Sequence, residues 1–259
     1  MVALTPRRAL SYSSGRFVSF PLLTRFYSLN SVRSALLIGV FALVLGVSPA
    51  RAQDYQDAQL WSQTVVTSQL SAKWRSHIEF QPRVFDNVRE LGITIIRTAI
   101  GRQITPRLTV WAGHAAVARS LGPRTAWENR AWQQLSITLP RAGTWNPSAR
   151  IRLEQRRLGA WANTSHRLRL MARAQRPVRA NSPWHVAFYD EAMFSLDTTA
   201  KGPFRGYDRN RAFGGVGRRL SPAFTLEGGY MWENSTIKGP GQRNEHIGLV
   251  TLNVNWPRH

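Results

Sequence analysis

The 259-residue sequence contains no cysteine, and only three of its basic residues are lysines, at positions 73, 201 and 238. Without cysteine the chain forms no disulfide, holds no metal through a thiolate and has no thiol nucleophile. The six histidines are scattered, and neither an H-x-H nor an H-E-x-x-H motif occurs. The sequence therefore predicts neither a metal site nor a cofactor.

Acidic residues are also few, because 14 Asp and Glu stand against 35 Lys and Arg, for a formal net charge of +21. Such an excess is typical of nucleic-acid-binding proteins, which gather it on one helix or in a basic tail. Here the arginines are spread along the whole chain, often at alternating positions. We therefore expect no nucleic-acid partner.

The N-terminal part, residues 1–52, contains six arginines and no acidic residue. Its apolar run, Ala35 to Val47, is 13 residues long, whereas a membrane-spanning helix needs about 20. A short apolar run between a basic segment and the tripeptide Ala50-Arg51-Ala52 is typical of a cleaved signal peptide. Residues 1–52 are therefore predicted to be a signal peptide, with an over-extended start, and residues 53–259 to be the mature domain. A short buried helix is the alternative.

N-terminal sequencing of the exported protein tests this prediction. Cleavage is expected between Ala52 and Gln53, so that Gln53 is the first residue of the mature chain. A different first residue would contradict the predicted cleavage site, and an uncleaved chain would favour the buried helix.

Residues 53–259 follow a period of two, which indicates β-strands. In residues 72–83, for example, Trp74, Ile78 and Phe80 share one face, and the charged residues share the other. No stretch of this region is apolar enough for a membrane helix, so a membrane protein with this sequence must be a barrel. The pattern predicts eleven candidate strands, at residues 57–67, 72–84, 91–103, 107–118, 127–139, 148–159, 165–176, 183–195, 208–220, 223–234 and 244–256.

Most candidate strands are longer than those of soluble domains and suit tilted transmembrane strands. Tight turns follow the third and ninth strands and long polar loops the eighth and tenth, an asymmetry typical of outer-membrane barrels. Single-chain bacterial barrels have even strand numbers, so either the first segment is not a barrel strand or a twelfth strand exists. The predicted fold is an all-β, antiparallel, up-and-down transmembrane β-barrel of ten or twelve strands.

Alternation does not tell which face points outward, because a soluble barrel has the same pattern inverted. Tryptophans near strand ends favour the membrane, where they form aromatic girdles; they are Trp61, Trp74, Trp111, Trp127, Trp184, Trp232 and Trp256. We expect a monomer in the bacterial outer membrane, whose partners are outer-membrane lipids and the barrel-assembly machinery.

Several short motifs recur in a characteristic order: Trp61, Glu79-x-Gln81-x-Arg83, Glu128-Asn129-Arg130-x-Trp132-Gln133, Arg150-x-Arg152-x-Glu154-Gln155-Arg156, Arg209-Asn210-Arg211, Glu227-x-x-Tyr230 and His246. In their order and spacing the chain resembles the uncharacterised bacterial family called domain of unknown function 2490. The resemblance covers nearly all of residues 57–254. It implies an outer-membrane-type barrel and no assigned activity.

Several of these motifs place acidic and basic side chains on one face of a strand, because residues two apart point to the same side. In a narrow barrel such groups would meet as ion pairs. This predicts a lumen charge network of Glu79, Arg83, Glu128, Arg130, Arg152, Glu154, Arg156, Arg209, Arg211 and Glu227. The network either packs the barrel or forms a charged constriction, and its excess of arginine would make a narrow channel prefer anions.

Two other functions stay open. An outer-membrane lipid-modifying hydrolase needs a Ser–His pair, but the neighbours Ser165 and His166 face opposite sides of a strand. His77, His114 and His246 have no serine at a suitable spacing, so no catalytic residue is predicted. A soluble periplasmic ligand-binding barrel is the second alternative.

Overall fold

The computed structural model of the protein describes residues 55–159, 164–199, 204–236 and 241–256. The predicted signal peptide, residues 1–52, and its cleavage site lie outside the described residues. Among those that are described, no helix is long and apolar enough to cross a membrane.

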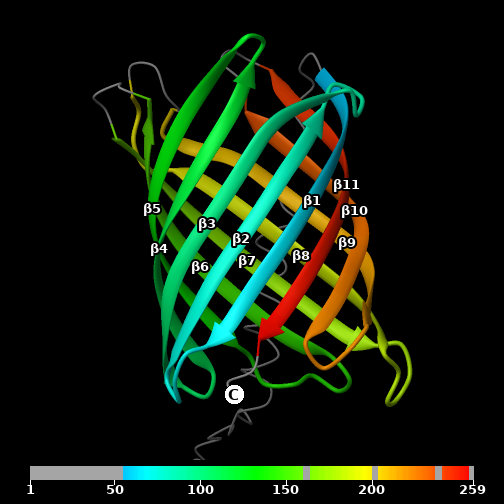
Figure 1. Ribbon diagram of the computed structural model, residues 1–259. Coiled ribbons are helices and arrows are strands. Elements are labelled where there is room, and N and C mark those ends of the chain that lie inside the picture. Colours follow the sequence, from blue (N-terminus) through cyan, green and yellow to red (C-terminus); the bar gives the residue numbers. More distant parts are fainter. Residues whose placement is uncertain (1–54, 160–163, 200–203, 237–240, 257–259) are drawn as a thin grey trace, which may run out of the picture. The chain divides into compact units, whose positions relative to one another are not determined.

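Eleven long strands make up nearly all of the described chain (Figure 1). Every predicted strand is present, and its ends lie within three residues of the predicted ones. The all-β prediction is therefore confirmed. The strands are β1 (Tyr55–Gln69), β2 (Trp74–Phe85), β3 (Glu90–Thr105), β4 (Leu108–Leu121), β5 (Arg124–Thr138), β6 (Asn146–Leu158), β7 (Thr164–Pro177), β8 (Trp184–Ser195), β9 (Gly206–Arg219), β10 (Phe224–Thr236) and β11 (Gln242–Trp256).

The strands form a closed barrel in which each strand pairs with its sequence neighbours and β1 pairs with β11. All neighbouring pairs are antiparallel except β1 and β11, which run parallel from Tyr55↔Arg243 to Ser68↔Trp256. The predicted even strand number and wholly antiparallel pairing are therefore wrong. With an odd number of strands in an up-and-down order, the first and last strands point the same way, so only a parallel pair can close the barrel.

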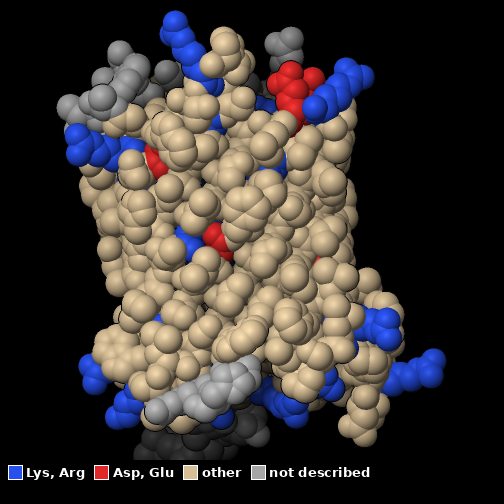
Figure 2. All heavy atoms as spheres, in the orientation of Figure 1, with Lys and Arg blue, Asp and Glu red and all other residues tan. Residues whose placement is uncertain are grey.

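Most of the large apolar side chains lie on the outer face of the barrel and most charged side chains on the inner face. On β2 and β3, for example, Ile78, Phe80 and Ile96 are about half exposed, whereas Glu79 and Arg97 are buried. In the space-filling view the middle of the visible face carries few charged atoms, and Lys and Arg gather toward the two ends (Figure 2). This distribution is the inverse of that of a soluble barrel, which buries its apolar side chains.

The tryptophans divide between the two faces. Trp74, Trp127, Trp184, Trp232 and Trp256 are exposed, as an outer girdle requires. Trp61 is only 2% exposed and Trp111 packs against an interior cluster, so the prediction that these two belong to a girdle is wrong. Both lie on the inward-pointing parity of their strands, which a position near a strand end does not reveal.

The turns differ less between the two ends than the sequence suggested. At the end where β11 terminates, β3 and β4 are joined by two residues, but β5 and β6 are joined by seven, residues 139–145. At the opposite end β8 and β9 have a long connection, yet β4 and β5 meet in a two-residue turn, where Gly122 has a φ of 63°. The contrast between short turns and long loops therefore holds for only some of the connections.

Candidate functional site

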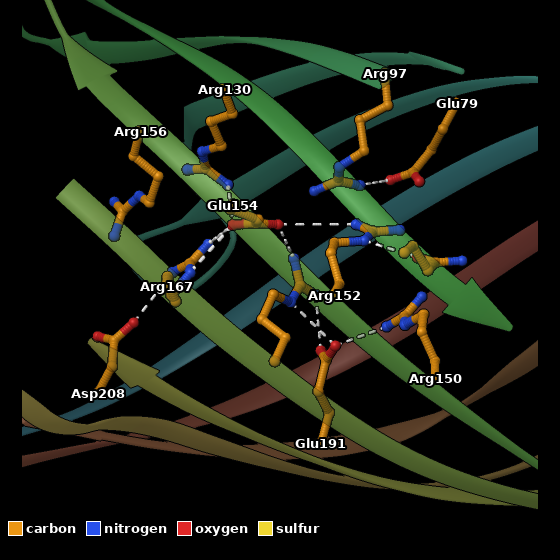
Figure 3. Close-up of polar contacts among 12 residues, drawn as sticks. Glu79, Arg97, Arg130, Arg150, Arg152, Glu154, Arg156, Arg167, Glu191 and Asp208 are labelled. Carbon is orange, nitrogen blue, oxygen red and sulfur yellow. Dashed lines mark hydrogen bonds and ion pairs between the residues drawn. The ribbon is translucent and has the colours of Figure 1, made fainter. Parts of the chain in front are cut away.

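Eight buried or half-buried side chains form a closed circuit of alternating charge on the inner wall of β6–β10. We call it the charge ring; its members, in order, are Asp208, Arg167, Glu154, Arg169, Glu191, Arg211, Glu233 and Arg209. Part of it is drawn in Figure 3, where contacts run from Asp208 through Arg167 to Glu154 and onward to Glu191. Each acid thus contacts two ring arginines, which satisfies its charge away from water.

Glu154 makes the most ion pairs in the ring and is only 1% exposed. Its two carboxylate oxygens accept hydrogen bonds from Arg167 Nη2 at 2.6 Å and Arg169 Nη1 at 2.7 Å. Arg152 and Arg130 lie farther away, at 3.8 and 4.0 Å. Four guanidinium groups therefore surround one carboxylate, which exceeds what a single negative charge can neutralise.

The shortest of these contacts join residues on different, paired strands and not residues of the same strand. Arg167 and Arg169 lie on β7, where Arg167 is the cross-strand partner of Glu154. Glu191 on β8 receives hydrogen bonds from Arg169 at 2.8 and 3.0 Å and from Arg150 at 2.6 Å. The network predicted from the sequence does not include Arg167, Arg169 or Glu191, because their partners depend on the strand register.

A second cluster surrounds Glu128 on β5. Arg130, two residues along the same strand, donates hydrogen bonds to Glu128 at 2.9 and 3.0 Å, and Arg156 on β6 donates one at 2.6 Å. This cluster contains three of the predicted network residues in direct contact. Their contacts follow from the alternation of charged residues along one strand and from the pairing of that strand with its neighbour.

Other predicted residues pair differently from the expectation. Glu79 contacts Arg97 on β3, not Arg83 on its own strand. Arg83 donates instead to Gln81 and lies 3.6 Å from the centre of the Trp61 ring. Glu227 accepts a hydrogen bond from Arg173 at 3.2 Å, although these residues are 54 positions apart. All ten predicted side chains point inward, but the partners of several come from distant strands.

The interior also has apolar parts, which the sequence analysis did not foresee. One cluster of buried residues gathers around Ile95, Val117 and Trp132, and another around Trp61, Met231 and Ile247. Two inward-facing glycines make room for the indole rings: a Cβ on Gly101 would lie 2.4 Å from the Trp111 ring, and one on Gly113 would lie 2.6 Å from Trp132. Rings and charged groups together fill the middle of the barrel.

A cavity of about 860 Å³ occupies the half of the barrel where β11 terminates. It reaches from Trp61, Glu79 and Arg152 in the interior to Arg141 and Asn181 in the connections at that end. Its lining among the described residues includes ten arginines but only three acidic residues, Glu79, Glu191 and Glu227. The cavity is therefore strongly positive.

The remaining buried carboxylates are balanced by arginines. Six of them lie outside the cavity lining, and each is ion-paired with at least one arginine: Asp57, Glu128, Glu154, Asp208, Glu233 and Glu245. The uncompensated positive charge of the interior is thus concentrated in the cavity.

The Ser–His pair that the hydrolase alternative requires is not found among the described residues. No serine hydroxyl among them is hydrogen-bonded to a histidine ring: His166 contacts Asp197 at 2.6 Å, and His246 contacts the hydroxyl of Tyr230 at 2.7 Å. Nor do the described residues contain a group of three or more His, Cys, Asp or Glu suited to a metal.

A closed β-barrel with an apolar outer face and an ion-paired, arginine-rich interior is the class of protein that these features define. The chain belongs to the family described as protein of unknown function DUF2490, whose profile matches residues 58–244. The resemblance seen in the sequence motifs is thereby confirmed. The chain is also 27% identical over 225 residues to an uncharacterised protein of Methylorubrum extorquens AM1, with 85% of this chain and 97% of that protein covered.

Proposed function

We propose that the protein is an exported, monomeric β-barrel of the bacterial outer membrane, which acts structurally or as a narrow, anion-preferring channel. The observation that carries the proposal is the inverted distribution of side chains, with Ile78, Phe80 and Ile96 outside and Glu79, Arg97 and Glu154 buried inside. In water this arrangement would expose a large apolar surface, which soluble monomers avoid. In a bilayer the same surface faces hydrocarbon.

The strand lengths and the ends of the barrel support this location. The strands are 12–16 residues long, and about 9–11 residues suffice to span a bilayer when a strand is tilted. At the end where β11 terminates, Arg102 lies over Trp74 at 5.7 Å and Arg218 lies over Trp184 at 5.3 Å, both on the outer face. Paired Trp and Arg suit the headgroup region, where an apolar ring and a charged tip both find partners.

The charge ring and the apolar clusters account for the narrowness of the proposed channel. They occupy the middle of the interior with side chains that are almost fully buried, including Glu154 and Glu233 at 1% exposure. Barrels of about eight strands are filled by side chains, and wide aqueous channels appear at about 16. Bulk permeation is therefore not expected, and small anions are the only solutes that the arginine excess favours.

Membrane fractionation combined with a heat-shift gel tests the location. The folded protein is expected in the outer-membrane fraction, to need detergent for extraction and to change mobility on boiling. Extraction without detergent would instead support a soluble periplasmic ligand-binding barrel. The lipid-modifying hydrolase would be supported by a change in lipids that depends on one histidine and one serine.

Planar-bilayer recording tests the channel. Conductance is expected to be absent or small, and any current in a salt gradient should be carried mainly by the anion, because the cavity is positive. Cation preference would overturn the selectivity, and a large conductance would show that the ion pairs do not close the barrel.

A further inference from the structure

We infer that the arginine-rich cavity is a binding site for a compact polyanion, a small molecule with two or more phosphate or carboxylate groups. This deepens the anion preference proposed above by naming the ligand class. It does not depend on the membrane location, since the cavity lies inside the barrel wherever the barrel resides. The cavity contains arginines that have no carboxylate of their own.

Two such arginines lie deep in the cavity. Arg83 is 7% exposed and lines the cavity, and among the described residues its guanidinium is hydrogen-bonded only to the neutral amide of Gln81. The carboxylate of Glu233 attracts Arg83 from a distance but forms no ion pair with it. Arg152 is 3% exposed and donates to Gln134 at 2.8 Å, while Glu154 lies 3.8 Å away and is shared with three other arginines. A buried cation without a matched anion is costly. An anion that binds beside it therefore forms a favourable electrostatic interaction that the protein alone does not provide.

Two further arginines stand near the mouth of the same cavity. Arg219 ends β9, and Arg141 lies in the β5–β6 connection. Among the described residues the side chain of Arg219 has no ion-pair partner, and that of Arg141 donates only to Asn146, at 2.7 Å. The cavity thus offers uncompensated guanidinium groups at two depths. One monovalent ion cannot satisfy both levels, whereas a molecule with two or more anionic groups can.

The size and composition of the cavity fit a small molecule. Its volume of about 860 Å³ lies in the range of ligand pockets. Its other polar lining groups include the amides of Gln134, Gln175 and Asn146, which can donate hydrogen bonds to oxyanions. The three acidic side chains of the lining are each already paired with an arginine, Glu79 with Arg97, Glu191 with Arg150 and Glu227 with Arg173.

Calorimetric titration of the folded, purified full-length protein at low salt tests the proposal with tripolyphosphate, inorganic phosphate and glucose as probes. Tripolyphosphate is expected to bind at least about tenfold more tightly than inorganic phosphate and to weaken as salt is raised, and glucose is expected not to bind. Equal affinity for the two phosphates would overturn the polyanion assignment. No binding of tripolyphosphate at millimolar concentration would overturn the site.

A matched pair of variants tests whether the site lies inside the barrel. Arg219→Met removes an inward guanidinium, and Arg218→Met removes its outward-facing neighbour, which lies over Trp184. Affinity for tripolyphosphate is expected to fall about tenfold or more in Arg219→Met and to stay unchanged in Arg218→Met, because a hydrogen bond to a charged group is lost only in the first. Equal effects of the two substitutions would show binding outside the cavity.

A deeper variant separates ligand binding from packing. Arg83→Met replaces a buried guanidinium by an apolar side chain of similar length. The ligand-free variant is therefore expected to be at least as stable to unfolding as the wild type, whereas its affinity for tripolyphosphate falls about tenfold or more. Lower stability with unchanged binding would overturn the role of Arg83. If bilayer recording shows cation preference but tripolyphosphate still binds, the proposed anion-preferring channel is wrong and the binding site is supported.

Discussion

Replacement of Glu154 by glutamine is expected to lower the free energy of unfolding by about 3–5 kcal/mol. The carboxylate is 1% exposed and accepts hydrogen bonds from Arg167 and Arg169. Glutamine keeps the size of the side chain but removes its charge. Buried guanidinium groups would then face one another with no anion between them, and like charges in a medium of low dielectric constant repel strongly.

Urea unfolding in detergent, followed by loss of the heat-shifted gel mobility, measures this effect. Glu90→Gln is the matched control, since Glu90 is exposed at the start of β3 and the same chemical change there should cost less than about 0.5 kcal/mol. A loss in Glu154→Gln as small as that in the control would mean that the charge ring contributes little to stability.

Replacement of Ile96 by arginine is expected to destabilise the barrel by about 2–4 kcal/mol in a lipid bilayer. Ile96 is 49% exposed on the outer face, beside Phe80 of the neighbouring strand, near the middle of β3. In an aqueous protein a half-exposed isoleucine tolerates a charged substitute at a cost of about 0.5 kcal/mol or less. The size of the effect thus reports directly whether this face contacts hydrocarbon.

Leu70→Arg is the control for this experiment, because Leu70 is as exposed as Ile96, at 51%, but lies in the β1–β2 turn. Reversible unfolding from lipid vesicles should show a cost of about 0–1 kcal/mol there, since the penalty falls toward the interfaces. Equal and small costs at the two positions would contradict the membrane location.

Both predictions concern the same physical feature, the separation of apolar and charged side chains across one layer of sheet. Charged groups inside a barrel are tolerated when each finds a partner, and the charge ring provides those partners for β6–β10. Where an arginine has no carboxylate of its own, as at Arg83 and Arg152, the fold leaves positive charge that stability alone does not explain. We expect such positions to serve binding, as natural proteins accept local instability at functional sites.

The sequence by itself was enough to predict the eleven strands and which side chains share one face of each strand. The reason is that the side-chain period of a strand is a local property, set by the backbone and readable from residues such as Trp74, Glu79 and Phe80. Ion pairs within one strand, such as Glu128 with Arg130, followed from the same period.

Only the tertiary structure decided how the barrel closes and which charges meet. The parallel pairing of β1 with β11 joins residues almost 200 positions apart, and no local pattern encodes it. Contacts such as Glu154 with Arg169 depend on the register between strands, and Glu227 with Arg173 depends on the curvature that brings distant strands face to face. The excess of arginine over acidic residues in one cavity is a sum over many strands, so only the tertiary structure determines it.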